Sequence, residues 1–242
     1  MAEVVLNVFR GDRNGGGEKA YTVPLVTGMV VLDAIHYIQA HYDGDLACRW
    51  NCKAARCGSC SAEINGRPRL MCKTRLDEYG GEITVRPMRA FPVIKDLVTD
   101  VSYNYQVARQ IPAFKPADGE AAFTMFQPDV NRAQEFRKCI ECFLCQNVCH
   151  VLRDHNGRES YFGPRFMIKI AALEMHPMDT GSRTALLRGA GGIGYCNITK
   201  CCEEICPEHI HITDNAIIPL KERVADDYWD PVRFVIRRLA GR

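Results

Sequence analysis

The chain has 242 residues, of which 47% are hydrophobic and 25% are charged, and its formal net charge is +2. This composition is ordinary for a globular protein with one large domain or two small ones. The near-neutral charge and the absence of a Lys/Arg stripe interleaved with aromatic residues argue against nucleic-acid binding. No stretch approaches the roughly 18 consecutive apolar residues of a membrane span, and the N-terminus lacks the pattern of a secretion signal.

Thirteen cysteines are the most informative feature of the sequence. Without a secretion signal, so many cysteines indicate thiolates bound to metal rather than a disulfide framework, because a reducing cytosol keeps thiols free. They fall into three groups, at 48–72, 139–149 and 196–206. Between the first two groups lies "FKPADGEAAFTMFQPDV", which has the composition of a connection. We therefore predict a domain boundary near residue 105, with domains at 1–105 and 106–242.

The N-terminal domain is predicted to be a compact α+β unit. The β-branched runs "VVLNVFRG" and "YTVPLV" predict two strands, and the glycine-rich "DRNGGGEKA" between them predicts a flexible hairpin loop. In "MVVLDAIHYIQAHY", Val31, Ile35 and Ile38 recur at helical spacing and predict a helix. The turn Asn65-Gly66 in "SAEINGRPRLMC" predicts a second hairpin.

The segment "CKAARCGSC" has the C-x4-C-x2-C spacing of plant-type 2Fe-2S sites, with a fourth cysteine twelve residues later. Gly58 would let the backbone wrap closely around a cluster. A structural zinc site is the alternative, but zinc prefers paired C-x2-C knuckles. Cys48 precedes the motif and is interpreted as a small buried hydrophobic residue. The predicted two-iron ligands are Cys52, Cys57, Cys60 and Cys72.

The second and third cysteine groups, "CIECFLCQNVCH" and "CNITKCCEEICP", resemble two copies of the run C-x2-C-x2-C-x3-C-P, in which the fourth cysteine of each run ligates the other cluster. The second copy has Thr199 where the second cysteine would stand. One cluster therefore keeps four thiolates and is predicted to be 4Fe-4S, while the other keeps three and is predicted to be 3Fe-4S. The 4Fe-4S ligands would be Cys139, Cys142, Cys145 and Cys206, and the 3Fe-4S ligands Cys149, Cys196 and Cys202.

Cys201 could in principle replace the missing ligand. Its displacement by one residue from Cys202 changes the direction of the side chain, so we interpret it as a spare buried thiol and keep a ligand role as the alternative. Two zinc sites could also use eight of these cysteines, but the ending Cys206-Pro207 favours the ferredoxin pattern. Gly163-Pro164 and "DPVRFVIRRL" mark helix starts, and we expect the second domain to be mostly helical. No nucleotide loop, nucleophile elbow or recognisable carboxylate pair is present, so no catalytic residue is predicted.

A plant-type two-iron domain, followed by a ferredoxin domain whose second run lacks its middle cysteine, closely resembles the iron-sulfur subunit of succinate dehydrogenase and fumarate reductase. The resemblance covers nearly the whole chain. It implies an α+β protein, with a β-grasp plant-type ferredoxin fold at 1–105 and an alpha-helical ferredoxin fold at 106–242. Carried over residue by residue, it gives the same three ligand sets as the spacing.

The resemblance implies the electron-transfer subunit of succinate dehydrogenase (succinate:quinone oxidoreductase), with no organic catalysis in this chain. The N-terminal domain would dock on a flavoprotein subunit whose FAD oxidises succinate. Three clusters would pass single electrons to quinone, either menaquinone or ubiquinone, at membrane-anchor subunits. The implied location is peripheral, on the cytoplasmic face of the inner (cell) membrane. The alternatives are fumarate reductase, a thiol:fumarate or heterodisulfide reductase-like relay, a free-standing carrier, and a zinc-stabilised interaction protein.

Three places depart from familiar members of this family. Familiar members have proline where this chain has His150, a tryptophan pair where it has "VLRDH", and histidine where it has Asn197. We expect His150 and Asn197 to lie near the quinone, at an anchor of a less common type or with a different quinone. A further hypothesis is that His150 helps to protonate the quinone.

Overall fold

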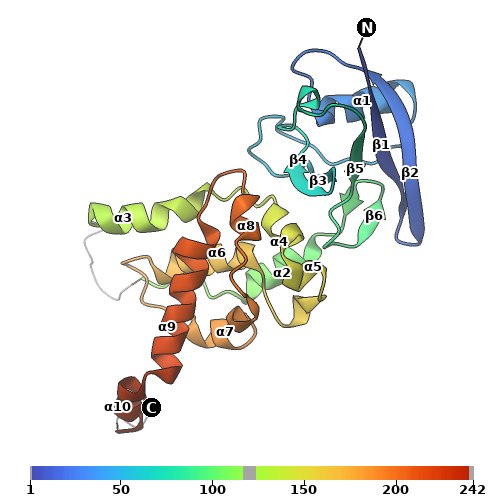
Figure 1. The fold of residues 1–242 in the computed structure, drawn as a ribbon. Coiled ribbons are helices and arrows are strands. Elements are labelled where there is room, and N and C mark those ends of the chain that lie inside the picture. Colours follow the sequence, from blue (N-terminus) through green and yellow to red (C-terminus); the bar gives the residue numbers. More distant parts are fainter. Residues whose placement is uncertain (1, 117–123, 240–242) are drawn as a thin grey trace. The chain divides into compact units, whose positions relative to one another are not determined.

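A computed structural model describes residues 2–116 and 124–239. The chain forms two compact units (Figure 1). Unit 1 comprises Met1–Tyr103 and Ile140–Val148, and unit 2 comprises Asn104–Cys139 and Cys149–Arg242. The border between them falls inside helix α2 (Ser102–Gln110). The mixed α+β class predicted from the sequence is confirmed, while the domain boundary near residue 105 stays a prediction.

Unit 1 is built on a seven-stranded sheet of order β4-β3-β5-β1-β6-β7, with β2 pairing with β1 (Figure 1). Its long hairpin joins β1 and β2 antiparallel, and β1 also pairs in parallel with β5, with Leu6 opposite Ile83. The strands are β1 (Glu3–Asp12), β2 (Gly15–Pro24), β3 (Ser61–Ile64), β4 (Arg67–Leu70), β5 (Ile83–Arg86), β6 (Val93–Lys95) and β7 (Val98–Thr99).

The glycine-rich tract of the first hairpin is strand rather than the flexible loop that its composition predicts. Gly15 already pairs with Asp12, so the turn consists of Arg13 and Asn14 alone. A Cβ at Gly16 would stand 2.4 Å from the carbonyl oxygen of Arg10. The glycines therefore let the two strands approach closely, a use that composition does not distinguish from flexibility.

The other predicted elements of unit 1 are confirmed. Helix α1 (Val31–His41) buries Val31, Ile35 and Ile38, and Asp33 accepts a hydrogen bond from the backbone N–H of Val30 at its start. The hairpin β3-β4 turns at Asn65-Gly66, where both residues have positive φ, at 48° and 74°. This is the conformation that an Asn-Gly turn of type I′ requires.

The segment Ile140–Val148, which includes α4 (Leu144–Val148), packs with unit 1 although it lies far along the chain. Asn147 explains the attachment: its amide donates to the Glu63 carboxylate at 2.9 Å and accepts from the N–H of Ala90 at 2.8 Å. All three groups are buried, so these bonds satisfy atoms that water does not reach. Two of the four cysteines of the first run, Cys142 and Cys145, therefore lie in unit 1.

The regular elements of unit 2 within its described residues are all helices, in agreement with the mostly helical domain predicted from the sequence. Pro164 stands in the first turn of α6, which buries Met167, Ile168 and Ile170. The elements are α2, α3 (Gln127–Gln134), η2 (Glu135–Lys138), α5 (His150–Arg153), η3 (Gly157–Glu159), α6 (Pro164–Glu174), α7 (Thr184–Arg188), η4 (Ile193–Tyr195), α8 (Cys201–Glu204), the π-helix η5 (Ile212–Ile217), α9 (Ile218–Trp229) and α10 (Pro231–Leu239). Helix α9 leads directly to α10 at the red end of the ribbon (Figure 1).

A buried arginine holds the connection between α6 and α7. The Arg183 side chain is 1% exposed and donates to Asp179 at 2.8 Å and to the carbonyl oxygens of Pro112 and Ala113 at 3.0 and 2.7 Å. These partners compensate the cost of burying the charge and fix the loop that leads toward the third cysteine group. Within residues 2–116 and 124–239, no helix is long and apolar enough to cross a lipid bilayer.

Candidate iron-sulfur centres

The loop from Cys52 to Cys60 in unit 1 has a backbone suited to an anionic cluster. Lys53 and Ala55 have positive φ, at 52° and 54°. Such left-handed residues at alternate positions turn successive N–H groups toward one side, as in the concave backbone sites that bind anions and iron-sulfur centres. The N–H groups of Ala54 and Arg56 both donate to the Cys52 Sγ at 3.3 Å.

The same loop brings the four predicted two-iron ligands together. The thiols of Cys52 and Cys57 interact with each other, as do those of Cys60 and Cys72. The second contact follows from the β3-β4 hairpin, which starts directly after Cys60 and returns to Cys72. The Cys72 N–H donates to the Cys60 Sγ at 3.4 Å. Four soft sulfur donors at this spacing fit a 2Fe-2S cluster.

These thiols differ in how easily they ionise. Burial opposes ionisation of Cys57, but hydrogen bonds from the Ser59 side chain and from the backbone of Cys52 and Ser59 outweigh it and lower the pKa of Cys57 to about 7. Burial raises the pKa of Cys60 to about 12. A bound metal would therefore have to displace a proton from Cys60, which couples cluster binding to pH.

The predicted four-iron ligands are divided between the two units. Cys142 and Cys145 are buried in unit 1, while Cys139 and Cys206 belong to unit 2, so their assembly into one ligand set stays a prediction. In unit 1, Gly58 packs against Cys142 so closely that an added Cβ would stand 2.5 Å from the Cys142 Cα. The Ser61 Oγ lies 2.9 Å from the carbonyl oxygens of both residues. The loop of the predicted two-iron site thus touches a predicted four-iron ligand.

The loops after Cys139 and Cys196 share one backbone pattern. In the first, Glu141 and Phe143 have φ of 56° and 59°; in the second, the corresponding Ile198 and Lys200 both have φ of 60°. Thr199 therefore stands between two left-handed residues, as Cys142 does in the first loop. The sequence pattern does not reveal this feature, because none of the four left-handed residues is glycine.

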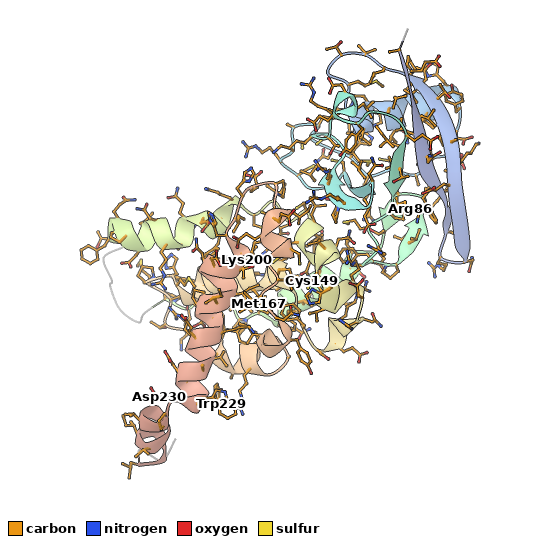
Figure 2. The ribbon with its side chains drawn as sticks, viewed as in Figure 1. Arg86, Cys149, Met167, Lys200, Trp229 and Asp230 are labelled. Carbon is orange, nitrogen blue, oxygen red and sulfur yellow. The ribbon has the colours of Figure 1, made fainter. Side chains whose placement is uncertain are left out.

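The predicted three-iron ligands all line one cavity in unit 2. The space between its lining residues that protein atoms do not fill is about 290 Å³, a volume that includes open solvent. Figure 2 labels Cys149 and Lys200, which belong to its wall. The lining consists of Cys149, His150, Val151, Tyr161, Pro164, Cys196, Asn197, Thr199, Lys200, Cys201, Cys202, Thr213 and Ile217.

Burial in the cavity wall opposes ionisation of two of the predicted ligands, Cys149 and Cys202. Burial raises the pKa of Cys149 to about 11 and that of Cys202 to about 12, with smaller contributions from neighbouring thiols. Burial also raises the pKa of Tyr161 well above its ordinary value, so its hydroxyl remains a hydrogen-bond donor beside Cys196. Three sulfur donors and a phenol that stays protonated fit an iron-sulfur cluster.

His150 and Asn197, the residues expected near a quinone, line this same cavity. His150 is half-buried at the first position of α5, and Asn197 is exposed. Cys201 also lines the cavity and is half-buried, whereas the sequence suggested a spare buried thiol. Cys48 is half-buried as well, and its thiol contacts the carbonyl oxygen of Arg49 at 3.6 Å.

Comparison with known families matches two stretches of the chain. Residues 5–106 match the family described as "2Fe-2S iron-sulfur cluster binding domain", and residues 135–210 match the family described as "4Fe-4S dicluster domain". The protein is therefore a two-domain iron-sulfur protein with 2Fe-2S and 4Fe-4S binding domains.

Individual relatives identify the family. The chain is 34% identical over 205 residues to the fumarate reductase iron-sulfur subunit of Mycobacterium tuberculosis, a match covering 79% of this chain and 80% of that protein. It is 31% identical over 208 residues to one subunit of the fumarate reductase (CoM/CoB) of Methanothermobacter marburgensis, covering 84% of this chain and 40% of that one. Among solved structures, a chain of the Mycobacterium smegmatis Sdh1 complex in the apo form is 60% identical, with a TM-score of 0.92, covering 95% of this chain and 98% of that chain.

The chain belongs to the family of iron-sulfur subunits of succinate dehydrogenase and fumarate reductase. It is an electron-transfer subunit of a multi-subunit oxidoreductase of this class. The family and enzyme class predicted from the sequence are confirmed.

Proposed function

We propose that the chain relays single electrons through three clusters, 2Fe-2S, 4Fe-4S and 3Fe-4S, in a succinate:quinone oxidoreductase. The ligand sets are those predicted from the spacing. The clusters supply one-electron redox chemistry, and the chain supplies thiolate ligands, backbone N–H groups and burial, which set the potentials. The 2Fe-2S and 4Fe-4S binding domains support two of the three clusters.

The observation that carries this proposal is the cavity of unit 2. It is lined by Cys149, Cys196 and Cys202, and Thr199 occupies the remaining corner of the repeated loop. A threonine hydroxyl is a hard, neutral donor that holds iron poorly beside sulfide, so three thiolates favour a three-iron cluster. A chain with one complete and one incomplete ferredoxin run thereby gains two clusters of different type and different potential.

Electrons would enter from FAD on a flavoprotein subunit that docks on the N-terminal domain, and would leave to quinone at membrane-anchor subunits. The chain would then sit peripherally on the cytoplasmic face of the cell membrane. Succinate oxidation is supported by the 60% identity to a chain of an Sdh1 complex. Fumarate reduction is the second candidate, because the Mycobacterium tuberculosis and Methanothermobacter marburgensis relatives are named fumarate reductase. Assaying both directions on the purified complex distinguishes the two.

His150 and Asn197 would form part of the quinone site. Both line the unit 2 cavity. This cavity would hold the three-iron cluster, the last centre of the proposed relay. Quinone reduction consumes protons, and histidine is a common proton donor in enzymes. Replacing His150 by Gln should lower the kcat of quinone reduction, and an unchanged rate would contradict this role.

The relay is tested by comparing Cys149→Ser with Cys48→Ala in the purified complex. Succinate oxidation is measured with quinone and with a dye that accepts electrons directly from flavin. We expect Cys149→Ser to lower the rate of quinone reduction by at least about 100-fold. Loss of a residue that only hydrogen-bonds a metal ligand lowers activity by up to about 100-fold, and loss of the ligand itself should cost at least as much. The dye rate should remain, and Cys48→Ala should retain both. Equal quinone rates in the two variants would contradict the proposed path.

A further inference from the structure

Cys201 lies at the corner of the unit 2 cavity where the second ferredoxin run lacks a ligand. Its Sγ stands 3.3 Å from the Thr199 Oγ1, and both residues line the cavity. It is also close enough to contribute to the raised pKa values of Cys149 and Cys202. Four thiols therefore surround this cavity rather than three.

The position of Cys201 in α8 explains how a thiol displaced by one residue reaches the corner. It is the first helical residue and follows Lys200, whose left-handed backbone (φ 60°) ends the loop. With this left-handed residue between them, the Cys201 side chain meets that of Thr199 two residues earlier. Sequence spacing alone does not reveal such a contact.

This corner is also accessible to an ion from solution. Thr199 and Lys200 are exposed and Cys201 is half-buried, whereas the matching Cys142 of the first loop is only 8% exposed. An iron at the Thr199 corner could therefore enter and leave without unfolding of the unit.

We propose that Cys201 is a reversible fourth ligand, through which the unit 2 cavity takes up one ferrous ion when its three-iron cluster is reduced. This inference rests on the proposed three-iron cluster. The one-electron-reduced 3Fe-4S core carries no net charge, and combining it with Fe²⁺ gives a 4Fe-4S core of charge two plus. No further electron moves, the Cys201 sulfur bonds the new iron, and the thiol proton passes to solvent. Release of Fe²⁺ reverses each change.

Ferrous iron would thereby regulate electron delivery. Cluster type helps to set the reduction potential, so conversion of the last centre changes the driving force for quinone reduction. The iron concentration that half-converts the cluster would then define the range in which the complex responds.

The test uses the purified complex under anaerobic conditions and ferrous ion alone as the probe. Oxidised samples are first examined by electron paramagnetic resonance for the three-iron signal. They are then reduced with dithionite, and the integer-spin signal of the reduced three-iron cluster is followed while ⁵⁷Fe²⁺ is added. Mössbauer spectra of the same samples report whether the added iron enters a four-iron cluster.

We expect the integer-spin signal of the wild type to disappear as iron is added, and that of Cys201→Ala to persist at iron concentrations at least about tenfold higher, a loss within the range expected for altering a metal site. Cys48→Ala is the matched control and should behave as the wild type. Cys201→Ser, which preserves size but offers only a hydroxyl, should take up iron more weakly than the wild type.

The possible failures are distinguishable. A three-iron signal that persists in the wild type, or vanishes equally in Cys201→Ala, overturns the role of Cys201 and leaves the proposed relay intact. Absence of a three-iron signal from the oxidised wild type overturns the three-iron proposal and this inference with it.

Discussion

The loops that follow Cys139 and Cys196 have the same alternation of left-handed residues but differ at one side chain, Cys142 in the first and Thr199 in the second. Their surroundings differ as well. Cys142 is buried against Gly58, whereas Thr199 is exposed at the rim of a cavity. The backbone therefore has the same form in both places, and under the proposed ligand sets the side chain at one corner would decide how many irons the loop can hold.

The largest change should come from making the second loop like the first. Thr199→Cys places a thiolate at the corner that matches Cys142, and should convert the three-iron cluster into a permanent four-iron cluster. Electron paramagnetic resonance of the oxidised complex should lose its three-iron signal. The double variant Thr199→Cys/Cys201→Ala should give the same result, because residue 199 would then supply the ligand. Retention of the three-iron signal in both variants would contradict the matched geometry of the loops.

A substitution at Gly58 can disturb the packing against Cys142 in the first loop without changing any predicted cluster ligand. Gly58 has φ of 68°, and an added Cβ would stand 2.5 Å from the Cys142 Cα. Gly58→Ala should lower the stability of unit 1 by about 2–5 kcal/mol, from left-handed strain of about 1–2 and overpacking of about 1–3 kcal/mol. Thermal unfolding and iron content of the complex measure the loss.

Gly66→Ala is the matched control for this packing test. Gly66 also has positive φ, at 74°, but an added Cβ would have nothing within 4 Å. This variant should show only the strain of about 1–2 kcal/mol. If the two glycine variants lower the melting temperature equally, the contact with Cys142 does not stabilise the first loop.

A substitution at Tyr161 should change the reduction potential of the proposed three-iron cluster without altering the ligands in the unit 2 cavity. Its hydroxyl lies beside Cys196, and hydrogen bonds to cluster sulfurs raise reduction potentials. Tyr161→Phe should lower the potential of the three-iron cluster by a few tens of mV, because a hydrogen bond of about 1 kcal/mol corresponds to less than one tenfold step of 59 mV. A redox titration followed by electron paramagnetic resonance measures the shift. If Tyr161→Phe leaves the potential of the three-iron cluster unchanged, together with those of the other clusters, a hydrogen bond from the Tyr161 hydroxyl to this cluster is excluded.

The smallest expected effect is a pH dependence at the start of the first loop. Glu135, just before Cys139, is 2.6 Å from the Nδ1 of His211. Its hydrogen bond and charge raise the pKa of His211, with smaller contributions from Glu203 and Asp214. Burial opposes ionisation of Glu135, but hydrogen bonds from His211 and Asn215 outweigh it and lower its pKa.

The sign of this pH dependence follows from the raised pKa of His211. The stability that the pair contributes is fully present below the ordinary histidine pKa of 6.5, and is lost as pH rises through the raised value. Melting temperatures of the wild type and His211→Gln should therefore converge as pH rises from about 6 toward 8. His41→Gln, in unit 1, is the control and should run parallel to the wild type. A constant difference between wild type and His211→Gln across this range would contradict the ion pair.

The sequence predicted the family, the α+β class and the hairpin at Asn65-Gly66, because cysteine spacing and the Asn-Gly dipeptide have direct structural causes. It did not predict the strand through Gly15–Gly17, because glycine serves both flexible loops and close strand contacts. The attachment of Ile140–Val148 to unit 1 depends on Asn147 meeting Glu63 across a long interval of sequence, which spacing does not encode. The position of Cys201 beside Thr199 likewise arises from a left-handed lysine.

The most direct test of this account is electron paramagnetic resonance of the oxidised, purified complex, with iron counted in the same sample. The account predicts a three-iron signal in the oxidised state and, on reduction, the signal of a two-iron cluster. An oxidised sample without a three-iron signal, which on reduction shows two four-iron clusters, would contradict the claim that Thr199 leaves the second loop with three ligands.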